Sequence, residues 1–135
     1  MVKYCNFFVL LVVFLCAGCA TLGYNPGREA RVAFFQSEDW TSEDTHQLDA
    51  HVHFTITPYK FPYTWISKSN SDIKYSIVGI KDYLRFGLCA KDVAITKENL
   101  KTGERTEVVF LAEQNHYRDQ YGNIHPKTGY ILHIR

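Results

Sequence analysis

The chain lacks the short patterns that mark many enzyme active sites. It contains no Gly-x-Ser-x-Gly nucleophile elbow, no His-Glu-x-x-His zinc motif and no glycine-rich loop that would cradle a phosphate. It also lacks the basic stripe typical of nucleic-acid-binding proteins, and its formal net charge is only +1. We therefore predict that the protein is not an enzyme, needs no cofactor and has no nucleic-acid partner.

A second absence concerns helices. No segment keeps an apolar period of 3.6 residues over three turns, as a long amphipathic helix requires. Short stretches in which apolar and polar residues alternate occur instead, and this period of two is typical of half-buried β-strands. The pattern predicts a β-rich protein.

The first twenty residues have the layout of a secretory signal peptide. Lys3 precedes an apolar run over residues 7–15, and small residues follow. Residues 17–19 are Ala-Gly-Cys and match the last three positions of a lipobox, with Cys16 at the position where Leu is usual. The N-terminus therefore resembles the signal peptide of a bacterial lipoprotein.

This resemblance implies cleavage after residue 18 and lipid attachment at Cys19. Acyl chains on that cysteine would bury many methylene groups at about 0.8 kcal/mol each, which gives stable membrane attachment. Ala20 follows the lipidated cysteine where an inner-membrane lipoprotein has Asp, so the resemblance implies the outer membrane and a domain facing the periplasm. Two alternatives are cleavage after Ala20, which gives a soluble secreted protein, and an uncleaved anchor over residues 7–22. That anchor is shorter than the roughly 20 residues of a spanning helix.

The expected organisation is a signal peptide over residues 1–18, a lipidated tether over 19–28 and one β-rich domain over 29–135. Of the four cysteines, Cys5 and Cys16 would leave with the signal peptide and Cys19 would carry lipid. Only Cys89 would remain, so an intramolecular disulfide is not expected. Because Cys89 lies in an apolar stretch, we predict a buried core thiol.

Charges are segregated along the chain. Residues 60–105 carry a basic excess and residues 19–59 an acidic one, which comes mostly from Glu38, Asp39, Glu43, Asp44 and Asp49. Such a division either attracts a partner or is neutralised by pairing across the fold.

The clearest predicted strand covers residues 50–57, where Ala50, Val52, Phe54 and Ile56 alternate with polar residues. Residues 92–112 predict a hairpin whose turn, at 99–103, uses Gly103 at positive φ. Further strands are expected at 31–35, 73–80, 84–88 and 130–135. Residues 59–66 predict an edge strand or an extended loop, residues 37–45 a polar loop or one helical turn, and residues 115–127 a polar loop. About seven short strands predict an all-β fold: a single antiparallel β-sandwich of immunoglobulin-like type, or a small barrel.

Two histidines suggest metal binding. On a strand over residues 50–57, His51 and His53 would lie on one face about 7 Å apart, a spacing that suits zinc or copper if a neighbouring strand supplies a third ligand. Other possible contributors are His46, Asp49, His116, His125 and His133. The alternative is a solvated strand face that happens to be rich in histidine.

Two groups of residues are candidate binding surfaces. The first is an alternating set that we call the aromatic row, and it consists of Tyr59, Phe61, Tyr63 and Trp65. Aromatic faces of this kind bind sugar rings or protein hot spots, but the same pattern also suits a core. The second lies in the predicted polar loop and consists of His116, Tyr117, Arg118 and Tyr121.

The sequence therefore predicts a membrane-anchored envelope lipoprotein that binds another envelope protein or a glycan and has no enzymatic activity. One alternative is an inhibitor or immunity lipoprotein against a cell-wall hydrolase or toxin, since the acidic stretch over residues 38–49 would suit a basic target. A second alternative is metal binding through His51 and His53.

Overall fold

The structure is a computed structural model and describes residues 26–54 and 59–134. In this part of the chain, two helices precede one five-stranded antiparallel sheet in which each strand pairs with the next along the chain. The elements are α2 (Pro26–Phe35), α3 (Ser42–Phe54), β1 (Tyr63–Ile66), β2 (Ile73–Arg85), β3 (Leu88–Asn99), β4 (Arg105–Arg118) and β5 (Ile124–His133).

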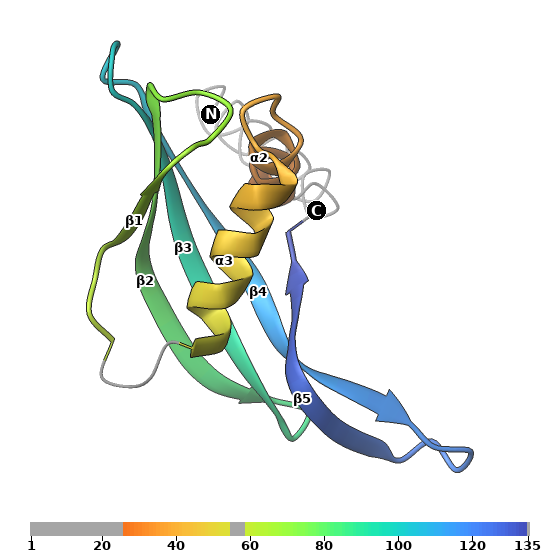
Figure 1. The fold of residues 1–135 in the computed structure, drawn as a ribbon. Coiled ribbons are helices and arrows are strands. Elements are labelled where there is room, and N and C mark those ends of the chain that lie inside the picture. Colours follow the sequence, from red (N-terminus) through yellow and green to blue (C-terminus); the bar gives the residue numbers. More distant parts are fainter. Residues whose placement is uncertain (1–25, 55–58, 135) are drawn as a thin grey trace, which may run out of the picture.

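The sheet is strongly curved, and both helices lie on its concave side (Figure 1). Register shifts between Ile77 and Gly79 in β2 and between Gln114 and His116 in β4 interrupt the regular pairing. Such bulges bend a strand and increase its twist, which favours this curvature.

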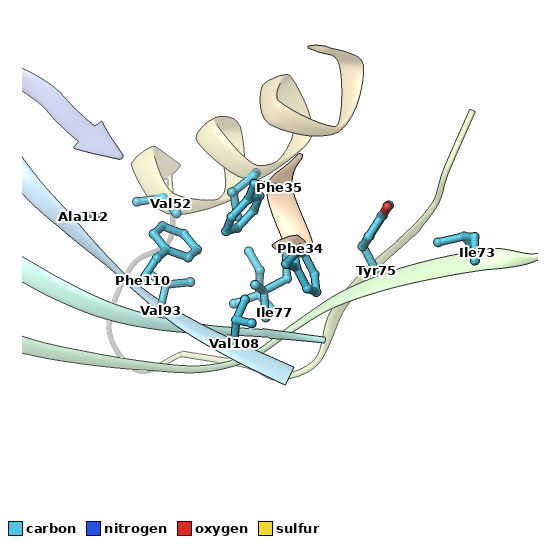
Figure 2. Close-up of a cluster of buried hydrophobic side chains, with 12 residues drawn as sticks. Phe34, Phe35, Val52, Ile73, Tyr75, Ile77, Val93, Val108, Phe110 and Ala112 are labelled. Carbon is cyan, nitrogen blue, oxygen red and sulfur yellow. The ribbon is translucent and has the colours of Figure 1, made fainter. Parts of the chain in front are cut away.

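The core lies between the helices and the concave face. Phe34 and Phe35 of α2 and Val52 of α3 face apolar strand residues such as Ile77 and Phe110 (Figure 2). The remaining buried core side chains are Leu48, Ile73, Tyr75, Val93, Ile95, Val108 and Ala112. Burial of this apolar surface provides the main favourable free energy of folding.

Asp44 forms one half of a capping box at the start of α3. The backbone N–H and the hydroxyl of Thr41 both donate to Asp44 Oδ2, each at 2.9 Å. Asp44 is 1% exposed, and its Oδ1 accepts a hydrogen bond from Trp65 Nε1 at 3.1 Å. The same carboxylate therefore accepts hydrogen bonds at the N-terminus of α3 and links that helix to β1.

The predicted β-rich fold is confirmed, whereas the sandwich and the number of about seven strands are not. Within the described residues there is one sheet, and α2 and α3 cover its concave face where a sandwich would place a second sheet. None of the described helices is long and apolar enough to cross a membrane.

Two predicted strands are wrong. Residues 31–35 belong to α2, whose first residue Pro26 has a fixed φ that suits a helix start and lies inside the predicted tether. Residues 50–54 belong to α3, and the rest of that predicted strand lies outside the described residues. The alternation does not mark a strand face, because Val52 is buried whereas Ala50 is exposed. Helix α3 is contacted on more than one side, since His51 meets β1 and His53 meets β5.

The hairpin predicted at residues 92–112 is confirmed. Strands β3 and β4 pair along their length, and Gly103 has a φ of 76° in the turn between them. The predicted edge strand is also confirmed, since β1 is the first strand of the sheet, although it is only Tyr63–Ile66.

The segregated charges pair across the fold. Lys97 Nζ lies 2.8 Å from Asp39 Oδ2, and Lys68 Nζ lies 3.1 Å from Glu43 Oε1. The hydrogen bond from Lys97 lowers the pKa of Asp39. The acidic excess of residues 38–49 is thus partly neutralised by Lys97 of β3 and by Lys68 in the connection between β1 and β2.

The prediction of a buried Cys89 is wrong, because its side chain is exposed. Its neighbours Leu88 and Ala90 are buried instead. Successive strand residues face opposite sides of a sheet, so Cys89 lies on the other face, near the start of β3.

Candidate binding surface at the hairpin end of the sheet

Two hairpin turns lie at the same end of the curved sheet, the lower end in Figure 1. One joins β2 to β3 and the other joins β4 to β5. We call residues 84–88 and 117–127 together the hairpin end. It carries four of the large exposed apolar or aromatic side chains: Leu84 at 75%, Phe86 at 81%, Tyr117 at 47% and Tyr121 at 80%.

The β2–β3 turn is a two-residue loop. Arg85 pairs with Leu88, and the loop residues Phe86 and Gly87 have φ angles of 53° and 77°. Positive φ at both loop residues is the pattern of a type I′ hairpin, in which Asn-Gly is the usual sequence. Phenylalanine therefore occupies a left-handed position that costs an L-residue with a Cβ roughly 1–2 kcal/mol.

The ring of Phe86 projects from this tight turn with little cover. Arg85 contacts it, with the guanidinium carbon 5.6 Å from the ring centroid, and Leu84 is exposed one residue further back. The sequence predicted a strand over residues 84–88 because the apolar residues alternate there. In the structure these residues are the end of β2, the turn and the first residue of β3.

The β4–β5 turn is organised by Asp119. Its Oδ1 accepts hydrogen bonds from the backbone N–H groups of Tyr121 at 2.8 Å and Asn123 at 2.9 Å. Its Oδ2 lies 2.8 Å from His125 Nε2, and this hydrogen bond lowers the pKa of Asp119. The turn thus holds a fixed backbone from which Tyr121 points to solvent.

The predicted polar loop over residues 115–127 is therefore mostly strand. Strand β4 continues to Arg118 and β5 begins at Ile124. Of the four candidates in that segment, Tyr117, Arg118 and Tyr121 are exposed, as a binding surface requires. His116 is only 23% exposed in its side chain, and its ring contacts Glu113 and the carbonyl of Gln114.

Basic side chains accompany the exposed rings. Lys127 Nζ lies 5.2 Å from the centroid of the Tyr117 ring, which also stacks on His125 at 5.0 Å. Arg118 and Lys127 are exposed, and neither forms an ion pair within residues 26–54 and 59–134. The hairpin end therefore combines aromatic rings with unpaired positive charge.

The aromatic row does not form one exposed face. Its rings make a continuous series, with centroids 5.7 Å apart for Tyr59 and Phe61 and 5.5 Å apart for Phe61 and Tyr63. Trp65 packs on Trp40 and Tyr75 beside the core and donates to Asp44. Phe61 is 37% exposed, and the other three side chains of the row are partly buried. Trp65 is therefore a packing residue, and the outer part of the row is the part accessible to a ligand.

Tyr59 belongs to a cluster around a buried lysine. The side chain of Lys91 is 8% exposed, and its Nζ lies 3.4 Å from the carbonyl oxygen of Val52 and 4.0 Å from Asp82 Oδ1. The same ammonium lies 5.4 Å from the Tyr59 ring and 5.0 Å from the Tyr130 ring, and the Tyr59 hydroxyl donates to Asp82. The positive charge near the last turn of α3 is favourable, because the helix dipole is negative there. The charged and polar groups of this cluster are paired with one another, so we assign the cluster a role in stability.

The predicted arrangement of His51 and His53 on one strand face is wrong. Both residues lie in α3, where positions two apart point in nearly opposite directions. His51 stacks on Trp65 at 5.7 Å, whereas the His53 ring contacts Tyr130 at 5.8 Å. Among the described residues, no group of three or more His, Cys, Asp or Glu side chains could hold a metal ion.

Sequence patterns point to part of the hairpin end and miss the rest. Composition points to Tyr117, Arg118 and Tyr121, whereas the alternation around Leu84 and Phe86 predicts an ordinary strand. The available signal was Gly87 after Phe86, since glycine commonly occupies the second position of a two-residue hairpin loop. Cys19 lies outside the described residues.

Comparison of the chain with protein-family models, with curated proteins and with solved structures finds no match.

Proposed function

We propose that this protein is a non-enzymatic lipoprotein of the bacterial outer membrane whose β-rich domain faces the periplasm and binds another envelope protein or a glycan. The anchor is proposed at Cys19, on the resemblance of residues 1–20 to a lipoprotein signal peptide. The sequence at that position supports both the lipid attachment and, through Ala20, the outer membrane.

The observation that carries the binding role is the presence of exposed aromatic rings on two short hairpin turns. Phe86 and Tyr121 are 81% and 80% exposed, and each projects from a short, hydrogen-bonded hairpin turn. The two turns lie at the same end of the sheet (Figure 1), and exposed apolar surface at one end of a domain is a candidate interaction site. Short turns that are closed by strand pairing or by internal hydrogen bonds have few backbone conformations to lose on association, which favours binding.

The electrostatic argument for an inhibitor of a basic enzyme is weaker than the sequence alone suggested. Asp39 and Glu43 pair with Lys97 and Lys68, and Asp44 is buried. The charge at the hairpin end is positive, which suits an acidic target. We therefore favour the envelope-binding role.

Mass spectrometry of the mature N-terminus from fractionated membranes tests the anchor. We expect a triacylated peptide that begins at Cys19 in the outer-membrane fraction, and a Cys19→Ser variant should lose this fraction. A soluble protein that begins after Ala20 would contradict the anchor.

Chemical crosslinking of envelopes from intact cells tests the binding role. The affinity-purified full-length protein should carry a crosslinked protein or a covalently captured glycan fragment. The absence of both kinds of adduct, with the protein folded and correctly located, would contradict binding to an envelope component.

A further inference from the structure

We infer that the hairpin end docks onto an acidic surface of a partner protein, on the side of the domain that faces away from the anchored end of the chain. This inference rests on the proposed function and adds to it the surface, the class of partner and the orientation.

The orientation follows from the position of α2. Ala30, Ala33 and Phe34 of this helix line a pocket together with Lys97 and Thr106, which lie near the β3–β4 turn. The hairpin end lies at the opposite end of the same strands (Figure 1). Strand β3 has 12 residues, and at a rise of about 3.3 Å each the two ends are roughly 40 Å apart.

The anchor proposed at Cys19 precedes α2 by only a short segment. The seven steps from Cys19 to Pro26 span at most about 25 Å when fully extended. The proposed anchor therefore holds the β3–β4 end within this distance of the bilayer and leaves the hairpin end free to reach into the periplasm.

The charge of the hairpin end indicates an acidic partner. Its one carboxylate, Asp119, binds its own turn and His125, and the neighbouring Glu113 lies 3.9 Å from both Arg85 and His116. Its exposed cations Arg118 and Lys127 have no carboxylate partner within the described part of the chain. A surface with occupied acids and free cations attracts carboxylates on a partner.

The kinds of side chain at the hairpin end favour a protein over a lipid surface. Tyrosine, phenylalanine and arginine are enriched in the centres of protein interfaces, where they contribute much of the binding free energy. Tyr117, Tyr121, Phe86, Arg85 and Arg118 provide all three residue types within the two hairpins. An end directed away from the anchoring bilayer is also badly placed to enter it.

Site-specific photocrosslinking in intact cells tests this inference with the full-length protein. A benzophenone amino acid replaces Phe86 or Tyr121 in two variants, and Leu100 in a third. Leu100 is 49% exposed and follows β3 at its opposite end, so it is a matched control. We expect a protein adduct of one discrete mass from positions 86 and 121 and none from position 100. Mass spectrometry should map the attachment to an Asp- or Glu-rich segment of the partner.

Charge reversal provides the second arm. Arg105 and Arg118 are the first and last residues of β4, and both are exposed. We expect Arg118→Glu to lower the adduct yield at least about fivefold, because it places like charges together, whereas Arg105→Glu should leave the yield unchanged. Circular dichroism checks that both variants fold.

Four results would overturn the inference: adducts with lipid or glycan, equal adducts from position 100, no adduct, or equal effects of the two charge reversals. A photocrosslinker at Phe61 separates this inference from the proposed function. An adduct from position 61 without one from 86 or 121 would preserve a binding role and assign it to the aromatic row.

Discussion

Replacing Phe86 with asparagine should make the protein more stable and less able to bind. Phe86 has a φ of 53° in a two-residue turn whose second residue is Gly87. Asn-Gly is the favoured sequence of such a turn because asparagine tolerates the left-handed region. The natural residue therefore reduces the stability of the hairpin.

The magnitude follows from two opposing terms. A left-handed conformation costs an ordinary L-residue roughly 1–2 kcal/mol, and asparagine avoids part of this cost. Against this gain, the variant loses the exposed contact between Arg85 and the Phe86 ring, which is worth about 0.5–1 kcal/mol. The ring itself is 81% exposed, so little buried apolar area is lost. The net of these terms is small, and we expect Phe86→Asn to raise the free energy of unfolding by up to about 1 kcal/mol and Tm by up to roughly 6 °C.

Urea unfolding followed by far-UV circular dichroism measures the effect, and Phe86→Ala is the matched control. Alanine removes the ring and the Arg85 contact but keeps the unfavourable φ, so its stability should be equal to that of the natural protein or slightly lower. Both variants should lose partner binding at the hairpin end. If Phe86→Asn is no more stable than Phe86→Ala, the left-handed backbone conformation of residue 86 does not lower the stability of the hairpin. The argument that this turn loses stability in favour of binding would then fail.

Three further substitutions test the packing around α3, each by urea unfolding. Asp44→Ala should lower the free energy of unfolding by about 2–4 kcal/mol, because the helix cap and the partner of the Trp65 indole are lost together. In a double-mutant cycle with Trp65→Phe, strictly additive losses would refute an energetic coupling between Asp44 and Trp65. Tyr75→Phe should keep or raise stability, because the buried Tyr75 hydroxyl has no hydrogen-bond partner among the described residues; a clear loss would refute this. Gly129→Ala should cost at least about 1 kcal/mol, since φ is 101° and a Cβ would lie 2.8 Å from the His53 ring; an unchanged midpoint would show that α3 moves freely against β5.

The β3–β4 hairpin could be predicted from sequence because its information is local. Strand alternation, the turn residues and Gly103 lie within one short segment. The edge strand Tyr63–Ile66 could also be predicted, because Pro58 and Pro62 restrict this part of the chain to the edge of a sheet. These features depend on neighbours in the chain and require no knowledge of the fold.

The error at α3 has a different physical cause. Leu48 and Val52 are its buried apolar residues, and Asp44 extends the same stripe one turn earlier. A stripe with a carboxylate in it has a weak helical period, while Ala50, Val52 and Phe54 happen to alternate. The concave sheet stabilises this segment as a helix, because it contacts several faces of α3 at once. Sequence patterns of one element cannot reveal such long-range packing.

The two ends of the sheet are built on opposite physical principles. At the β3–β4 end, which we also call the α2 end, the Asp39 carboxylate accepts a hydrogen bond from Lys97. The carbonyl of Asp39 accepts from Ser67 and Ser69. These hydrogen bonds hold the connection between the two helices against the sheet. At the hairpin end, Phe86 adopts an unfavourable backbone conformation and gains little packing in return. A folded domain tolerates such local conflict most readily where a side chain serves another molecule. The contrast therefore directs the search for a partner to the hairpin end, while the α2 end remains the stable base of the domain.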